Sequence, residues 1–352
     1  MTPVATGRVW QNARVLPAPA LLSVRRLKVQ YPIAPAWPWQ AAGRIQAVDD
    51  LHFNLHAGET LGIVGESGCG KSTLARALVG LQRVTAGGIV YRGQDLAPLD
   101  DAGWRPYRRE IQMIFQDPAA SLDPRMTVGE IIAEPLELLC PELEAIERQS
   151  RVTQLLNRVG LPEFHGRYPH EISGGQCQRV GIARALIVQP KILICDEPVS
   201  ALDLSVQAQI ITLLSELQRE QGLAMIFIAH DLAVVRHLSH RVLVMYLGKV
   251  MEQAPAADLF KHPRHPYTRA LLASAPSSVP RRAGAPRRTV LEGDLPSPAD
   301  PPSGCVFRTR CPMADAMCAR QAPHLRRVSA SGYAACHYLE QSAAGSEQTV
   351  LA

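Results

Sequence analysis

The sequence of 352 residues lacks any apolar run that approaches the roughly 18 residues needed for a membrane-spanning helix. Its most apolar stretches, such as 223–229, have the length of a buried strand instead. The N-terminus also lacks the basic start and apolar core of a secretory signal peptide. We therefore expect the chain to stay in the cytoplasm.

Aromatic residues and lysine are scarce as well. Aromatic residues make up 5% of the chain, which argues against a stacking platform for single-stranded nucleic acid. The net charge of +5 comes mostly from arginine, and no concentrated basic patch indicates nucleic-acid binding. A modest basic excess is compatible with contact to a membrane surface or an acidic partner, but it ordinarily reflects solubility alone. The only lysines are Lys28, Lys71, Lys191, Lys249 and Lys261.

Strand and helix patterns alternate from about residue 21 to 262, which predicts an α/β core with a largely parallel sheet. Residues 119–168 show amphipathic helix patterns without a strong strand, and we interpret them as an inserted helical subdomain. Strands are expected at 60–64, 191–196, 223–229 and 242–247, and helices at 71–79, 127–139, 151–159 and 207–221.

The regions on either side of this core, which we place at 21–262, differ from it in composition. Residues 1–20 are interpreted as a disordered leader and 341–352 as a disordered tail. Residues 263–340 are expected to form a C-terminal domain. Within it, the stretch 276–304 is rich in Pro, Arg and Ser, which predicts an extended tether or surface loop.

A phosphate-binding loop is predicted between the strand at 60–64 and the helix at 71–79. Glycines let backbone N–H groups turn inward around phosphate oxygens, and the helix directs its positive end at the same oxygens. Lys71 is expected to neutralise the β- and γ-phosphates of a nucleotide, and the Ser72 hydroxyl to bind Mg²⁺. The strand–loop–helix context disfavours a chance match. The residues assigned to nucleotide binding here are Gly65, Glu66, Ser67, Gly68, Cys69, Gly70, Lys71, Ser72 and Thr73.

Two acidic residues end the apolar strand predicted at 191–196. Such a strand presents them at its carboxyl end, where open α/β sheets bind ligands. Asp196 is expected to hold Mg²⁺, and Glu197 to polarise the water that attacks the γ-phosphate. An Asp-Glu pair alone is more often a surface turn, so this interpretation depends on the phosphate-binding loop.

After the helical region, Ser173, Gly174, Gly175 and Gln176 resemble the signature sequence of ATP-binding-cassette proteins. A serine hydroxyl and glycine amides at a helix N-terminus form an anion-binding surface, although a serine cap before flexible glycines is the common structural alternative. In this family the signature closes on ATP held by a partner subunit, so that ATP is hydrolysed within a dimer. The resemblance implies a P-loop NTPase (RecA-like) core, an antiparallel β subdomain and an inserted helical subdomain at about 117–185. A small cysteine-containing C-terminal extension follows them here.

The remaining elements of the family stand in order along the chain. Gln116 resembles the glutamine that links Mg²⁺ and the attacking water to the helical subdomain. His230 resembles the switch histidine that contacts the γ-phosphate and orients Glu197; a lone histidine after a strand is more often structural, and only its place in this series favours the role. Asp203, with the preceding residues 200–202, resembles the loop through which two subunits sense each other. Tyr31 is the candidate for stacking on adenine.

The resemblance extends over 21–338, to the ATPase subunits of oligopeptide and dipeptide importers. Segments 265–272, 293–298 and 302–312 are similar to sequences of those subunits, and Cys177 and Cys195 are similar to residues of the second, or F-type, ATPase. The resemblance implies a peripheral ATPase on the cytoplasmic face of the inner membrane. Its implied partners are a related but different ATPase chain, two membrane permease subunits and, indirectly, an extracytoplasmic substrate-binding protein. The implied cargo is a peptide or a similar small solute.

Four of the eight cysteines gather near the end of the chain, at Cys305, Cys311, Cys318 and Cys336. In a reducing compartment disulfides are not expected. Four thiolates can hold Zn²⁺ or an iron–sulfur cluster, but the spacing lacks a C-x-x-C pair, and four free buried thiols are the alternative. The resemblance to importer ATPases with these cysteines implies a [4Fe–4S] cluster that stabilises a tail with little core of its own.

Two competing hypotheses stay open. The first is a soluble cassette ATPase of DNA repair or translation, but such proteins usually carry a long coiled-coil insertion or two cassettes, and the sequence has neither. The second makes the C-terminal cysteines a redox or metal sensor that gates the ATPase.

Overall fold

The computed structural model describes residues 19–33, 37, 43–200, 202–274 and 293–339. Residues 1–18 of the predicted leader, 276–292 of the predicted tether and the predicted tail at 341–352 lie outside these ranges.

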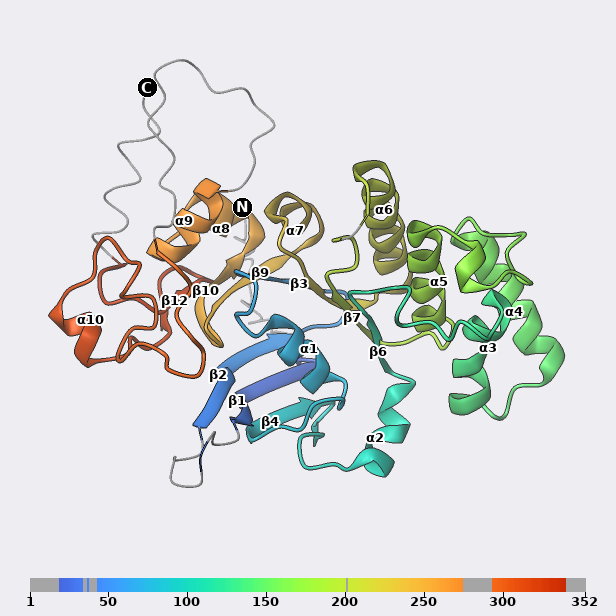
Figure 1. The fold of residues 1–352 in the computed structure, drawn as a ribbon, viewed down its shortest axis with the longest axis horizontal. Helices are drawn as coiled ribbons and strands as arrows, with labels where there is room; N and C mark the ends of the chain where they lie inside the picture. The colour runs from blue at the N-terminus through green and yellow to red at the C-terminus, as the bar shows by residue number, and fades with distance from the viewer. Residues whose placement is uncertain (1–18, 34–36, 38–42, 201, 275–292, 340–352) are drawn as a thin grey trace, which may run out of the picture.

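Two β-sheets organise the described part of the chain (Figure 1). The larger has the strand order β11-β12-β10-β9-β3-β8-β7-β6, and the smaller has the order β2-β1-β4-β5. The strands are β1 (Leu22–Ile33), β2 (Gly43–Leu55), β3 (Thr60–Val64), β4 (Ala86–Tyr91), β5 (Gln94–Asp95), β6 (Ile111–Ile114), β7 (Ile192–Asp196), β8 (Ala224–Ile228), β9 (Arg241–Tyr246), β10 (Lys249–Pro255), β11 (Arg326–Arg327) and β12 (Tyr333–Ala334).

Helices surround these sheets. They are α1 (Lys71–Leu78), α2 (Asp101–Arg108), α3 (Val128–Leu139), α4 (Ala145–Arg158), α5 (Gly174–Leu186), α6 (Leu204–Gln221), α7 (Leu232–Leu238), α8 (Ala256–Lys261), α9 (Pro266–Ser274) and α10 (Ala316–Arg320), with a short 3₁₀ turn at Pro169–Glu171.

The centre of the larger sheet is parallel. Strands β6, β7, β8, β3 and β9 pair in parallel, and every residue of β3, β7 and β8 is buried. Apolar strands that are buried on both faces form this kind of sheet because helices cover each side. The sequence-based prediction of an α/β core with a parallel sheet is thus confirmed.

Element boundaries differ from the sequence-based prediction mainly at helix starts. The helix predicted at 207–221 begins at Leu204, because the Asp203 carboxylate accepts hydrogen bonds from the N–H groups of Ser205 and Val206 and caps it there. The helix predicted at 151–159 begins six residues earlier, at Ala145. Both first turns are exposed, so apolar periodicity does not reveal them.

The helices α3, α4 and α5 form a region of their own at one end of the molecule (Figure 1). Their shared apolar core includes Val128, Ile132, Leu156 and Val180. Thr127 starts α3 with a capping box, in which its hydroxyl oxygen accepts the Glu130 N–H and the Glu130 carboxylate accepts the Thr127 N–H.

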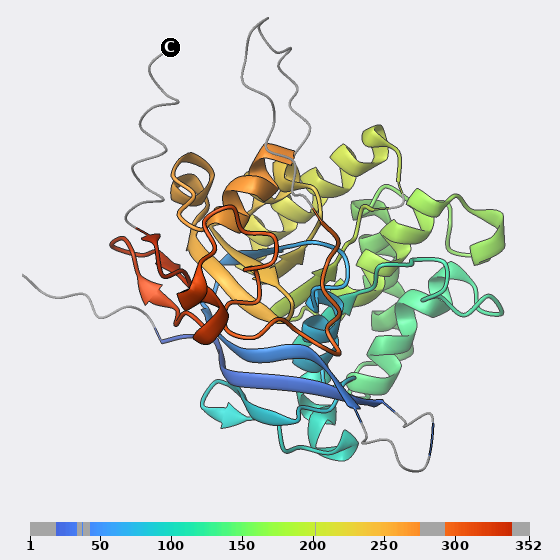
Figure 2. The ribbon, with the colours of Figure 1, turned by 60° about the vertical axis from the view of Figure 1, so that its left-hand side comes forward.

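The C-terminal segment, by which we mean residues 263–274 and 293–339, lies at the opposite end and packs on the same core as the larger sheet. Strand β12 extends that sheet by pairing with β10. The Phe307 ring lies 5.4 Å from Tyr246 of β9 and 5.3 Å from Tyr267 of α9, measured between ring centroids. Figure 2 shows this segment, in red, beside β10 and the blue strands of the smaller sheet. The residues predicted to form a C-terminal domain therefore share a core with the larger sheet.

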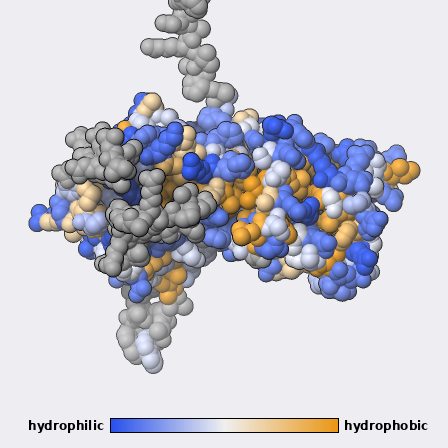
Figure 3. Space-filling model, turned by 90° about the horizontal axis from the view of Figure 1, so that it is seen from above, coloured by the Kyte–Doolittle hydropathy of each residue, from blue (hydrophilic) through white to orange (hydrophobic). Residues whose placement is uncertain are grey.

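The surface carries no extensive apolar belt in the view of Figure 3. Hydrophilic side chains cover most of the visible described surface, and hydrophobic ones gather in a patch near the middle of that face. Among the described helices, none combines the length and the apolar character needed to cross a membrane.

We predict that Phe307→Ala lowers the free energy of unfolding by about 3–5 kcal/mol, because it empties a fully packed aromatic site between two parts of the chain. Urea unfolding of the full chain measures this change. Met317→Ala is the control, since that side chain is 46% exposed. A variant whose C-terminal segment unfolds in a separate, earlier transition, leaving the main transition unchanged, would contradict the shared core.

Candidate active site

The predicted phosphate-binding loop connects β3 to α1. Two of its glycines, Gly68 and Gly70, have φ of +77° and +103°. Residues with a Cβ rarely adopt these positive φ values, whereas glycine adopts them without strain. A Cβ at Gly70 would lie 2.0 Å from the carbonyl oxygen of Ala47 in β2. The loop is therefore held tightly against the smaller sheet.

Lys71 and Ser72 begin α1 inside this loop. The Lys71 ammonium donates to the carbonyl oxygens of Gly65 and Glu66 at 2.9 and 3.0 Å, which places a buried positive charge within the loop. The Ser72 hydroxyl donates to Asp196 Oδ1 at 3.1 Å, although the two residues stand 124 positions apart. A hydroxyl and a carboxylate that meet in this way form an oxygen ligand set of the type Mg²⁺ prefers.

Gln116, Glu197 and His230 converge beside that pair. Gln116 Nε2 donates to Glu197 Oε2 at 3.0 Å, and His230 Nδ1 lies 3.9 Å from the same oxygen. The three residues follow β6, β7 and β8, three neighbouring parallel strands whose carboxyl ends share one edge of the sheet. Glu197 has φ of +48°, an uncommon backbone conformation for a residue with a side chain.

The electrostatics of this edge favour a bound cation. Burial, together with the neighbouring Glu197 carboxylate, raises the pKa of Asp196. A divalent cation would stabilise both carboxylates in their charged form. Ser72, Asp196 and Gln116 are the side chains that could hold it.

One cleft brings Ser72, Gln116 and Glu197 together with Tyr31, the residue predicted to stack on adenine. Residues of the phosphate-binding loop also line it, whereas Asp196 and His230 do not. The sequence did not point to three other lining residues, Ile45, Ala47 and Pro298. Pro298 belongs to the segment 293–298, which the sequence singled out only through its resemblance to importer ATPases.

The predicted signature residues and Asp203 do not line this cleft. Ser173 caps α5: its hydroxyl oxygen accepts the Gln176 N–H, and the Gln176 side chain accepts the Ser173 N–H. The N-terminus of α6 packs beside it, since a Cβ at Gly175 would lie 2.7 Å from Val206 Cγ1. Asp203 caps α6, and hydrogen bonding to Ser205 lowers the pKa of its carboxyl. The neighbouring Ala201 lies outside the described residues.

Comparison with known proteins finds two matching families. The family described as ABC transporter matches residues 48–200, and the one described as oligopeptide/dipeptide transporter, C-terminal region, matches 251–318. The oligopeptide transport ATP-binding protein OppF of Salmonella typhimurium is 54% identical over 89% of this chain and 95% of its own length. AppF of Bacillus subtilis, with the same description, is 51% identical over 90% and 97%. The chain belongs to the family of oligopeptide transport ATP-binding proteins.

Solved structures place the ATP-binding protein among cassette ATPases. The dimeric structure of a post-hydrolysis state of the ATP-binding cassette MJ0796, bound to ADP and Pi, is 30% identical with a TM-score of 0.61. It covers 67% of this chain and 98% of the other. The predicted fold class is thereby confirmed.

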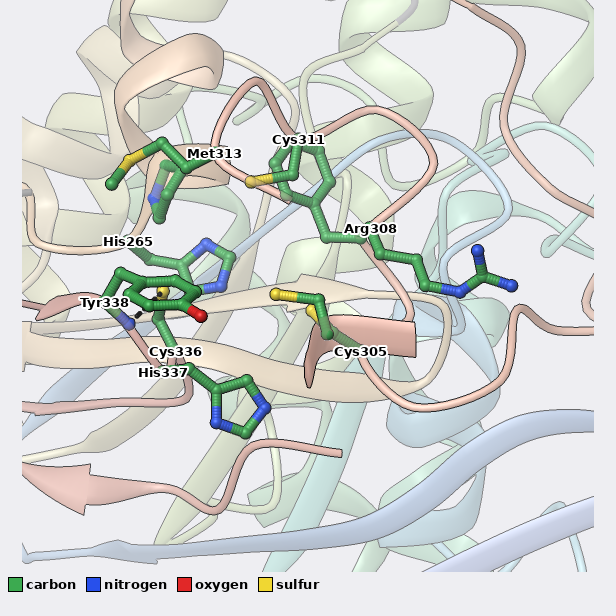
Figure 4. Close-up of a pocket in the computed structure, with 11 residues that line it drawn as sticks. His265, Cys305, Arg308, Cys311, Met313, Cys336, His337 and Tyr338 are labelled. Atoms are coloured by element: carbon green, nitrogen blue, oxygen red, sulfur yellow. Dashed lines mark hydrogen bonds between the residues drawn. The ribbon is translucent and has the colours of Figure 1, made fainter. Parts of the chain in front are cut away.

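The four C-terminal cysteines of the ATP-binding protein line one small pocket, together with His265, Phe307, His337 and Tyr338. Figure 4 shows the side chains of Cys305, Cys311 and Cys336 around the same space, which the His265 and Tyr338 rings border. The eight cysteines all lie in the described ranges, and none of them forms a disulfide. Burial raises the pKa of Cys305, Cys311 and Cys336, that of Cys311 to about 11.

Within the described residues, no group of three or more Cys, His, Asp or Glu side chains is close enough to hold a metal ion. The donor set is nevertheless one that fits zinc or an iron–sulfur cluster, because soft sulfur ligands line the pocket and no carboxylate does. Neutral thiols in an apolar pocket become thiolates only when a cation compensates their charge.

We predict that Gly70→Ala abolishes nucleotide binding and lowers the free energy of unfolding by about 2 kcal/mol or more, because both φ and the Ala47 contact exclude a Cβ. Equilibrium binding and urea unfolding measure the two effects. Gly181→Ala in α5 is the matched control, since a Cβ there meets nothing within 4 Å. Equal changes for the two variants would show that the loop tolerates a side chain at position 70.

Proposed function

We propose that this chain is the ATP-hydrolysing subunit of a membrane importer for peptides or similar small solutes. The observation that carries the proposal is the meeting of Gln116, Glu197 and His230 beside the Ser72–Asp196 pair. Of these residues, Ser72, Gln116 and Glu197 line the cleft of the phosphate-binding loop. The family of the chain and the descriptions of its relatives as oligopeptide transport ATP-binding proteins support the cargo class.

In the proposed reaction, Lys71 and the loop amides bind the β- and γ-phosphates, while Tyr31 stacks on the adenine. Ser72, Asp196 and Gln116 would hold Mg²⁺, which neutralises phosphate charge when bound. Glu197 polarises the attacking water, and its contact with Gln116 fixes the carboxylate at the edge of the cleft. His230 lies within reach of the same carboxylate and orients it.

The site needs a second subunit in this proposal. Ser173, Gly174, Gly175 and Gln176 stand outside the cleft of their own chain, which supports their action on ATP bound by a partner ATPase. Asp203 stands at the start of α6, which packs against Gly175. A contact between subunits that moves Asp203 would therefore also move the signature residues. We infer that the partner is a related ATPase chain.

A groove between α2 and α3 is the surface that we assign to the membrane permease. Leu81 and Leu138 line it and are 58% and 57% exposed, and Arg105 and Arg108 border them. Exposed leucines suit a partner segment with apolar side chains, whereas Arg108 is already paired with Asp101 of the same groove. This contact would hold the subunit at the cytoplasmic face of the membrane, with the substrate-binding protein acting only through the permease.

We predict that Glu197→Gln lowers the rate of ATP hydrolysis at least about 100-fold, because a neutral amide cannot polarise water, while ATP binding persists. Phosphate release by the assembled complex and binding of a fluorescent ATP analogue measure the two effects. Glu216→Gln, on the exposed side of α6, is the control. Normal turnover by Glu197→Gln would remove Glu197 from the proposed reaction.

We further propose that Cys305, Cys311, Cys318 and Cys336 hold a [4Fe–4S] cluster. The support is their common pocket and their soft sulfur donors. Chain purified without oxygen should contain iron and acid-labile sulfide in equal amounts, and Cys311→Ser should lose both. Cys140→Ser, a buried cysteine at the end of α3, should keep them. Zinc without sulfide, or four free thiols without metal, would contradict the cluster.

A further inference from the structure

Glu66 of the phosphate-binding loop makes two polar contacts with the C-terminal segment. Its backbone N–H donates to the Tyr267 hydroxyl at 3.0 Å, and its carboxylate accepts from Arg310. These partners stand 201 and 244 positions later in the chain, outside the part matched by the ABC transporter family. The proposed reaction uses neither of them.

The Arg310–Glu66 ion pair is well shielded from solvent. Arg310 Nη1 lies 2.9 and 2.8 Å from the two carboxylate oxygens of Glu66, and the side chains of Arg310 and Glu66 are 7% and 25% exposed. The Arg310 guanidinium also lies over the Tyr246 ring, 5.9 Å from its centroid. A charge-assisted pair at this depth is screened little by salt and fixes geometry more firmly than a surface pair.

Tyr267 holds the other side of Glu66. The tyrosine is fully buried, and its ring contacts Tyr246 and Phe307 at centroid distances of 4.8 and 5.3 Å. The Glu66 carbonyl oxygen meanwhile accepts a hydrogen bond from Lys71. The N–H, the carboxylate and the carbonyl of one loop residue are therefore each engaged, two of them by the C-terminal segment.

A third contact from the same segment reaches the loop and the cleft. Leu295 Cδ2 lies 4.0 Å from where a Cβ of Gly68 would stand. Three residues on, Pro298 lines the nucleotide cleft, and its carbonyl oxygen accepts the Gln46 N–H at 3.2 Å. The C-terminal segment thus touches the nucleotide site from two directions.

We propose that Arg310 and Tyr267 are positioning residues for the phosphate-binding loop, and that they hold Glu66 in the conformation that nucleotide binding requires. The inference rests on the proposed function, because it assumes that the loop binds ATP. It also connects the cysteine pocket to the nucleotide: Arg310 directly precedes Cys311, and Phe307 lines the pocket while it packs on Tyr267.

The test compares full-length variants by nucleotide affinity and by stability. Arg310→Gln should raise the Kd for a fluorescent ATP analogue with Mg²⁺ about tenfold, and Tyr267→Phe at least about threefold, because each removes a bond to Glu66. Glu66→Gln combined with Arg310→Gln should weaken binding no more than Arg310→Gln alone, since both changes remove the same pair. Arg320→Gln, an exposed arginine of α10, is the matched control and should leave Kd unchanged.

The stability measurement separates positioning from anchoring. If Arg310→Gln and Tyr267→Phe lower the urea midpoint but bind the analogue like the wild type, the two residues only anchor the C-terminal segment and the proposal is overturned. If Arg310→Gln does not fold, Tyr267→Phe and Glu66→Gln are compared by the same two measurements. Wild-type binding of the analogue together with a lowered urea midpoint would again overturn the proposal. Wild-type chain that fails to bind the analogue would overturn the proposed function as well, and that failure is seen before any variant is made.

Discussion

The conformation of the phosphate-binding loop is the constraint on which the other parts of the site depend. The loop is pressed against β2, where a Cβ at Gly70 would collide with the Ala47 carbonyl. The turn between β9 and β10 closes it from another side, since the Gly248 N–H donates to the Cys69 carbonyl oxygen at 2.9 Å. With Tyr267 and Arg310 at Glu66, the loop is bounded by the smaller sheet, the larger sheet and the C-terminal segment. Few local movements can therefore change its shape without moving one of these parts.

The same sheet edge that supports the loop concentrates negative charge. Asp196 and Glu197 follow each other at the end of β7, and burial makes the charged form of Asp196 costly. Ser72 donates one hydrogen bond to Asp196, and Gln116 donates one to Glu197, but a neutral donor offsets only part of the cost of a buried carboxylate. A bound cation compensates the charge of the two carboxylates, and an anionic triphosphate compensates the charge of the cation and of Lys71. This explains in physical terms why the phosphate-binding loop and the two carboxylates occur together.

Local patterns allowed most of this site to be predicted from the sequence. The glycine spacing of the loop, the carboxylates after an apolar strand and Ser173 before α5 are each properties of a few consecutive residues. Contacts such as Glu66–Arg310 depend on a fold that brings residues 244 positions apart together, and no local pattern records them. The same reason hides Ile45 and Pro298 in the cleft, because neither residue has distinctive chemistry. The fold class was predictable because strands and helices have distinct apolar periodicities. The pairing of β12 with β10 was not predictable, because it involves only two residues of each strand, too few to show a period.

The contacts also suggest how the proposed hydrolysis at Glu197 is coupled to movement of the helices α5 and α6. Gln116 joins the Glu197 carboxylate to the loop before the helical region, and in that loop the Ser121 carbonyl oxygen accepts from Arg184 of α5 at 2.6 Å. Helix α5 begins at the signature residues, and Gly175 packs on Val206 of α6, the helix that Asp203 caps. A chain of direct contacts thus runs from the proposed water-activating carboxylate to both surfaces proposed to face the partner subunit. Because each contact lies at a helix end or in a short loop, a shift of α3 to α5 as a unit would change them all together. On this argument, the proposed closure onto a partner subunit would shift the proposed catalytic Glu197 at the same time.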